Sequence, residues 1–222
     1  MHFLQPALFA EGPTDHRFLK PLLDRLCVDL CLRSRATVET ADVIELQPAT
    51  AHRHLPRAAC IAKTALSAKS SWNLLFIHAD ADGDEQAARA QRVWPGIDEL
   101  HRLLNSARHP AVAIVPVRTT EAWALADGKA LRHAYGVTLD DRQLRIPTNP
   151  RDVEQLPDPK SALLASFLAT SPSRKKARGG VAPYLGLMGG NVSIAVLRRV
   201  PAFAQLETDL LAALVSLRMI ET

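Results

Sequence analysis

The chain has 222 residues, 47% of them hydrophobic and 23% charged, which is the balance of a soluble globular protein with a core of its own. The formal net charge of +4 permits a phosphate-rich partner without requiring one. Aromatic residues make up only 5%, which argues against a surface built mainly for base stacking.

The first elements are a strand and an amphipathic helix. The apolar run Phe3–Ala10 predicts a strand that ends before Gly12 and Pro13. Apolar residues then recur every three or four positions up to Cys31, which predicts a helix. Thr14 or Asp15 is expected to cap its N-terminus.

The next part of the chain repeats this alternation. Residues Val38–Leu46 predict a second strand and His52–Lys69 a second helix. A third, buried strand is expected over Asn73–Ala79. The helical pattern of Glu85–Ser106 follows, and Pro95 should break or kink it.

A fourth strand is expected over Ala111–Val117, where Pro116 indicates a strand end or an edge. Thr119 or Thr120 should then cap a short helix. Strands that alternate with helices predict an α/β fold, namely a mostly parallel sheet with helices on both faces.

The composition changes near residue 140, where four prolines indicate a loop or a boundary. We expect an α/β core over residues 1–140, with a loop and a small helical C-terminal region over 141–222 packed on it. The expected C-terminal helices are Ser161–Ala169, Ala182–Met188, Val192–Arg199 and Ala202–Leu217.

Acidic residues follow directly on three of the expected strands. Glu11 follows the first, Asp80 and Asp82 the third, and Glu121 the fourth. Ligands of parallel sheets bind beyond the carboxyl ends of the strands, so these carboxylates are expected to share one rim. Clustered carboxylates repel one another unless a cation lies between them, and Mg²⁺ (or Mn²⁺) is the usual one.

Structural roles compete with this interpretation. Asp80 and Asp82, at i and i+2, should project to the same side and bind the ion. Asp84 equally suits the start of the next helix. Glu11 could be a further ligand or the general base, or simply part of a helix-entry turn. His78 is interpreted as a core histidine with its hydrogen bonds made.

The densest basic run lies in the C-terminal part and comprises Arg174, Lys175, Lys176 and Arg178. Such a run can bind the phosphates of a nucleic acid, or it can be a solvated loop. Lys176 and Lys160 are candidate catalytic cations that would stabilise charge developing on a phosphodiester.

The expected compartment is the cytoplasm. Three cysteines without a C-x-x-C pair indicate a reducing environment. The N-terminus lacks the basic region of a signal peptide, and no apolar run reaches the length of a membrane span, so no membrane association is expected.

The order of strand-Glu11-Gly12 and strand-Asp80-x-Asp82 resembles the Toprim domain of type IA and type II topoisomerases, bacterial primases and overcoming-lysogenization-defect nucleases. A longer resemblance runs through E-G-P-T-D, H-A-D-A-D, P-V-R-T-T-E-A-W-A-L-A-D, S-R-K-K-A-R-G-G-V-A-P-Y-L and L-R-R-V-P-A-F-A-Q-L. It points to the Toprim-like family catalogued as domain of unknown function 4276, whose genes often neighbour ATPase genes in bacterial defence islands.

The resemblance implies a metal-dependent nuclease acting on DNA or RNA, with metal ligands at Glu11, Asp80, Asp82 and Glu121 and an ATPase as a possible partner. The alternative is a non-catalytic Toprim-like adaptor that binds nucleic acid or an ATPase. Strand-passing chemistry needs a tyrosine nucleophile and gate domains, for which the chain is too short.

Overall fold

The computed structural model describes residues 2–106 and 109–221. Its centre is a four-stranded, fully parallel sheet in the order β4-β2-β5-β6. The strands are β2 (Pro6–Phe9), β4 (Ile44–Glu45), β5 (Leu74–His78) and β6 (Ala111–Ile114). The expected α/β fold with a parallel sheet is confirmed.

Each of the first two expected strands is divided between this sheet and a small second one. Strands β1 (His2–Leu4) and β3 (Val38–Thr40) pair with each other in a parallel ribbon. The division falls at Gln5, whose amide donates to the Asn73 side chain (2.9 Å). That bond takes the place of a hydrogen bond between strands. The chain therefore stops pairing with β3 before Gln5 and pairs with β5 after it.

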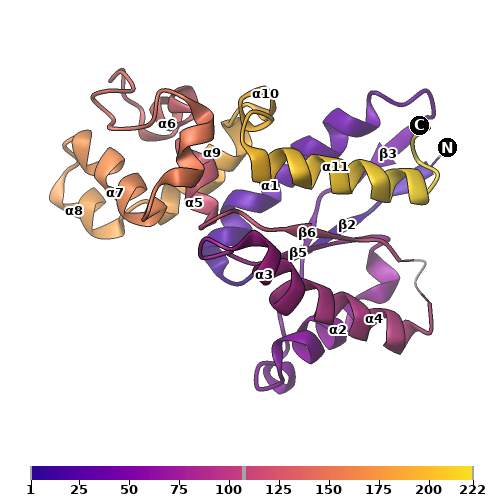
Figure 1. The fold of residues 1–222 in the computed structure, drawn as a ribbon. Coiled ribbons are helices and arrows are strands. Elements are labelled where there is room, and N and C mark those ends of the chain that lie inside the picture. The colour runs from indigo at the N-terminus through magenta and orange to yellow at the C-terminus, as the bar shows by residue number, and fades with distance from the viewer. Residues whose placement is uncertain (1, 107–108, 222) are drawn as a thin grey trace.

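Helices cover both faces of the sheet (Figure 1). One face packs on α1 (Pro13–Cys31) and α11 (Pro201–Ser216), the other on α2 (Arg57–Ser67) and α4 (Trp94–Leu104). Strand residues alternate between the two cores, so Phe76 lies with Phe18 while Ile77 lies with Ile61.

The helix after β5 is not broken at Pro95. Helix α3 (Glu85–Ala88) runs into a π-helical turn, Arg89–Val93, which leads into α4. Proline near the start of α4 lacks an amide donor, and the wider π turn ahead of it accommodates the loss. Turns of this kind often mark functional sites, and this one carries Arg92.

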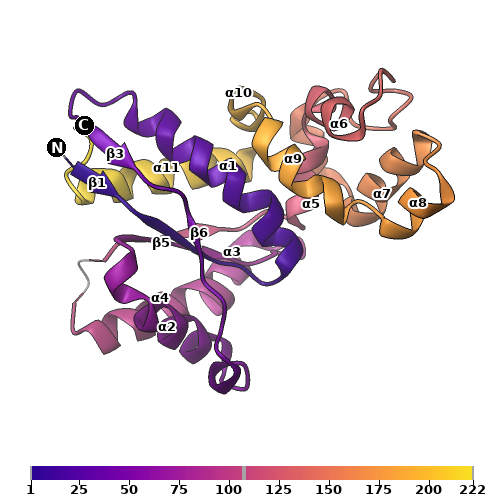
Figure 2. The ribbon, with the colours of Figure 1, turned by 180° about the vertical axis from the view of Figure 1, so that it is seen from behind.

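The remaining helices form a lobe beside the sheet (Figures 1 and 2). They are α5 (Thr120–Leu125), α6 (Gly128–Tyr135), α7 (Pro159–Ala169), α8 (Arg174–Gly179), α9 (Leu185–Asn191) and α10 (Ile194–Leu197). Short 3₁₀ turns complete the described chain at Thr50–His52, Lys69–Ser71, Pro150–Gln155 and Ala182–Tyr184.

Helix α11 then leaves the lobe and packs against β6. The expected division at residue 140 stays a prediction, since α5 contacts α7, α6 contacts α9, and α11 returns to the sheet. Within the described residues, no helix combines the length and the apolar character that crossing a membrane requires.

Candidate metal centre

The candidate site lies where the chain leaves the two central strands and β6. Strands β2 and β5 are adjacent, and in a parallel sheet both end at the same edge. The segment after β6 reaches this edge as well, since the Thr120 hydroxyl donates to Asp15 Oδ1 (2.8 Å). Residues from three distant segments therefore meet there.

Three buried side chains come close together at this edge. Among the described residues, Asp15, His78 and Asp80 form one group whose potential ligand atoms all lie within 4.8 Å of one another. His78 Nε2 lies 3.2 Å from Asp80 Oδ1, and His78 Nδ1 lies 3.9 Å from Asp15 Oδ2. Glu11, Asp82 and Glu121 are not members of this group.

Several potential ligand atoms of this group lack hydrogen bonds. Within the part of the chain that the structure describes, both ring nitrogens of His78, Oδ1 of Asp80 and Oε2 of the neighbouring Glu121 are buried without a hydrogen bond. Unpartnered buried polar atoms are rare because leaving water without a new partner costs free energy. One divalent cation would give a ring nitrogen of His78 and Oδ1 of Asp80 the partner that they lack, and Asp15 offers a third ligand atom within the same 4.8 Å, so the residues fit a metal ion.

This finding corrects the interpretation of His78 as a core histidine with its hydrogen bonds made. Its side chain is fully buried, yet neither nitrogen makes a hydrogen bond, and Nε2 lies 3.2 Å from the Asp80 carboxylate. The sequence held one signal for it, since His78 lies two positions before Asp80 at the end of β5. A histidine in an apolar run is usually a core residue, and only the surrounding side chains show that this one differs.

Asp15 is held in place rather than capping the helix from its first position. The N-cap of α1 is Gly12, so neither Thr14 nor Asp15 occupies the expected N-cap position, although Asp15 takes part in a capping box as the third residue of the helix. Asp15 lies in the first turn, and its Oδ2 accepts the Gly12 amide (3.0 Å). With Thr120 on its other oxygen, Asp15 has a fixed orientation towards His78.

Glu11 makes ion pairs at the same rim. Its Oε1 lies 2.9 Å from Arg57 Nη1 and 2.5 Å from Arg92 Nη2. Neither arginine was predicted from the sequence to lie at this rim. Nothing in their spacing marks them, because α2 supplies one and the π turn the other, 46 and 81 residues along the chain from Glu11.

Asp80 and Asp82 do not share one environment, although an extended segment would place them on the same side. Strand β5 ends at His78, and Asp82 has a left-handed backbone with φ 53°. The Asp82 side chain is 79% exposed, that of Asp80 12%. Asp84 caps α3 by accepting the Ala87 amide (2.9 Å), which confirms its structural interpretation.

Lys160 reaches the site from the lobe. Its Nζ lies 3.7 Å from Asp80 Oδ2. Burial alone would lower the pKa of Lys160, but the attraction of Glu121, Asp80, Asp15 and Asp82 outweighs burial and raises it. Lys160 is therefore held as a cation beside the acidic group.

The basic run lies elsewhere. It forms the short helix α8 at the outer end of the lobe (Figures 1 and 2). Its charged side chains are exposed. Lys176 lines a separate cavity of about 240 Å³ together with Tyr135 and Tyr184. The roles of Arg174, Lys175, Lys176 and Arg178 in nucleic-acid binding or catalysis stay predictions.

No protein-family model, curated protein or solved structure matches this chain. The resemblance to Toprim-like proteins therefore stays an expectation, and the geometry of the site carries the functional argument.

Proposed function

We propose that the protein is a divalent-metal-dependent nuclease that hydrolyses phosphodiester bonds in DNA or RNA. The observation that carries the proposal is the buried group of Asp15, His78 and Asp80, in which both His78 nitrogens and Asp80 Oδ1 lack hydrogen bonds. Its position at the carboxyl ends of the central strands is where α/β proteins bind ligands. The Toprim-like order of acidic residues supports the reaction type.

Asp15, His78 and Asp80 would hold the ion. An imidazole nitrogen among carboxylates suits Mn²⁺ better than Mg²⁺, which takes oxygen ligands almost exclusively. Glu121 and Asp82 remain proposed as further ligands at the rim. A divalent ion bound there would polarise the phosphodiester and lower the pKa of a bound water.

The cations of the site would act on the phosphate. Lys160, kept charged by the surrounding carboxylates, would offset the negative charge that develops on the phosphodiester. Glu11 is proposed as the general base that takes the proton from the attacking water. The arginines Arg57 and Arg92 hold its Oε1, so that oxygen can take a proton only after they release it.

The proposal is tested by incubating the purified protein with labelled DNA and RNA in the presence of Mn²⁺. The wild-type protein should cleave at least one of them, and the Asp80→Ala/Asp82→Ala variant should not. Asp42→Ala is the control, since that side chain is 90% exposed and lies away from the rim. Undiminished cleavage by the double variant would contradict the proposed roles of Asp80 and Asp82 in a nuclease reaction.

The same experiment tests the adaptor alternative. An adaptor would bind the strands and leave them intact at every Mn²⁺ concentration, in all three proteins. The cleavage assay would then be repeated with a candidate ATPase partner added. The proposed compartment is the cytoplasm, which the three free cysteines Cys27, Cys31 and Cys60 support.

A further inference from the structure

We infer that Arg57 and Arg92 form the binding site for a phosphodiester group of the substrate, and that the Glu11 carboxylate occupies this site in the protein without nucleic acid. The identity of the anion rests on the proposed function. The site itself rests on the contacts of the two guanidinium groups.

The backbone fixes Arg57 in place. Its Nε donates to the Arg92 carbonyl (2.9 Å) and its Nη2 to the His78 carbonyl (2.8 Å). Both bonds go to main-chain atoms, so the guanidinium plane is set independently of Glu11. The remaining Nη1 is aimed at Glu11 Oε1, 2.9 Å away. Arg57 is thus ready to bind an anion at that position.

Arg92 approaches the same oxygen from the π turn. Its Nη2 donates to Glu11 Oε1 (2.5 Å), while its Nη1 donates to the Asp80 carbonyl (2.6 Å). Two cations therefore share one carboxylate oxygen. A phosphodiester carries the same single charge and also offers two oxygens to guanidinium groups, so it can take the place of the Glu11 carboxylate.

The position is reachable and lies beside the candidate metal centre. The side chains of Glu11, Arg57 and Arg92 are 21%, 30% and 33% exposed. Arg92 binds the carbonyl of the residue whose carboxylate belongs to the metal group. A phosphate taken up by the arginines would displace Glu11 and free it as a base next to the same phosphate.

The test measures affinity for a fluorescein-labelled single-stranded oligonucleotide by anisotropy, with the full chain and EDTA so that no cleavage occurs. Glu11→Gln should bind about tenfold more tightly than wild type, because the arginines lose their competitor. Arg57→Gln and Arg92→Gln should each bind at least about tenfold more weakly.

Matched controls come from an exposed ion pair on α4. Glu99 and Arg102 pair with each other and not with Glu11, Arg57 or Arg92. Glu99→Gln and Arg102→Gln therefore make the same charge changes without altering the proposed phosphate site. They should shift the affinity less than threefold. Equal gains for Glu11→Gln and Glu99→Gln would overturn the inference, as would inorganic phosphate binding more tightly than the oligonucleotide.

The outcome is separable from that of the proposed function. A gain of affinity in Glu11→Gln cannot arise from misfolding, so it stands even if Arg57→Gln proves unstable. If this binding pattern appears but Mn²⁺ brings no cleavage, the nuclease proposal fails and the phosphate site remains. If cleavage is present and the pattern is absent, only the arginine site is wrong.

Discussion

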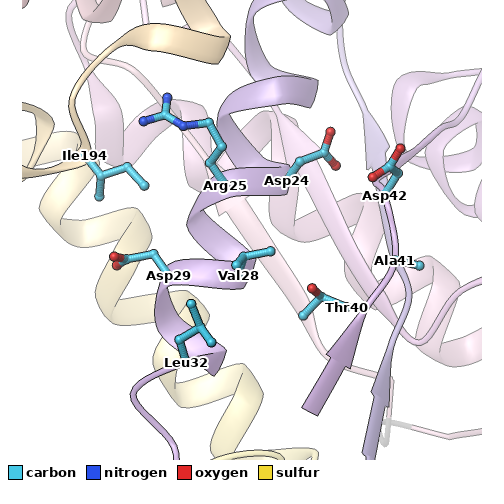
Figure 3. Close-up of a pocket in the computed structure, with 9 residues that line it drawn as sticks. All are labelled: Asp24, Arg25, Val28, Asp29, Leu32, Thr40, Ala41, Asp42 and Ile194. Atoms are coloured by element: carbon cyan, nitrogen blue, oxygen red, sulfur yellow. The ribbon is translucent and has the colours of Figure 1, made fainter.

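Helix α1 supplies aspartates to two regions, and the two regions differ in whether the side chains around those aspartates are hydrogen-bonded. At the N-terminal end of α1, Asp15 faces His78, whose two ring nitrogens lack hydrogen bonds, and Asp80, whose Oδ1 lacks one. Further along, Asp24 and Asp29 line a groove of about 380 Å³ between α1 and β3, on opposite sides of Val28 (Figure 3).

The carboxylates of the groove have partners. Asp24 accepts the Val43 amide (2.6 Å) and pairs with Lys20 (3.1 Å). Asp29 forms ion pairs with Arg33 and with Arg198, which also binds Glu207 of α11. These bonds join α1 to the segment after β3 and to the helices beside it, so the aspartates of the groove have a structural role.

The comparison shows that the number of acidic residues does not identify a site. The groove holds three aspartates, and their partly or largely exposed carboxylates pair with cations and amides of the fold. The strand-end group holds two aspartates, and both ring nitrogens of its histidine and Oδ1 of Asp80 are buried without a hydrogen bond. What marks the strand-end group is that these unbonded atoms lie together, on side chains that can all bind one metal ion, at the carboxyl ends of the central strands.

The largest expected effect is a gain in stability on Mn²⁺ binding, which should depend on the strand-end group and not on the groove. Mn²⁺ at about 100 times its Kd should raise the free energy of unfolding by about 2.7 kcal/mol. For a chain of this size that corresponds to a rise in Tm of about 5–10 °C. Asp80→Asn should abolish the rise and Asp24→Asn should keep it, measured by thermal denaturation. Equal rises in both variants would place the ion elsewhere.

The lobe contains a buried polar side chain, Tyr135, that has a hydrogen-bond partner. Tyr135 Oη lies 3.2 Å from Ser166 Oγ, and burial raises the pKa of Tyr135 to about 12. The unfolded phenol ionises near pH 10, so this stabilisation is complete below pH 10 and is lost as pH rises towards 12.

The loss should reach about 2 kcal/mol across that window. Tyr135→Phe should remove this part of the alkaline dependence, measured by urea denaturation between pH 9 and pH 11.5. A variant whose stability falls as steeply as that of wild type would show that other groups cause the loss.

The smallest expected effect is the change in unfolding free energy when one aspartate of the groove or of the strand-end group is neutralised in the absence of metal. Asp29→Asn should lower the free energy of unfolding by about 0.5–1 kcal/mol, since it weakens partly exposed ion pairs. Asp80→Asn should not lower it, because the change removes a buried charge that lacks hydrogen bonds on Oδ1. Both are measured by urea denaturation in EDTA. A larger loss in Asp80→Asn would contradict the comparison.

Local patterns in the sequence determined the class of the fold and the position of the rim. Alternating apolar runs and amphipathic helices predicted the parallel sheet, because burial of one helix face and of whole strands leaves a periodic pattern. The order of strand and carboxylate predicted that Asp80 lies at the sheet edge. Cap chemistry within one helical turn predicted the role of Asp84, which the structure confirms.

Tertiary structure alone decided which polar groups have partners. Asp15 meets Thr120 across 105 residues and Glu11 meets Arg92 across 81. No local pattern records such pairs, since hydrogen bonds and charge pairing depend on distance in space. His78 and the two arginines were missed for this reason. The sequence by itself determined that Glu11 and Asp80 follow strands of a parallel sheet, and the fold determined which side chains at that edge are paired and which are left for a ligand.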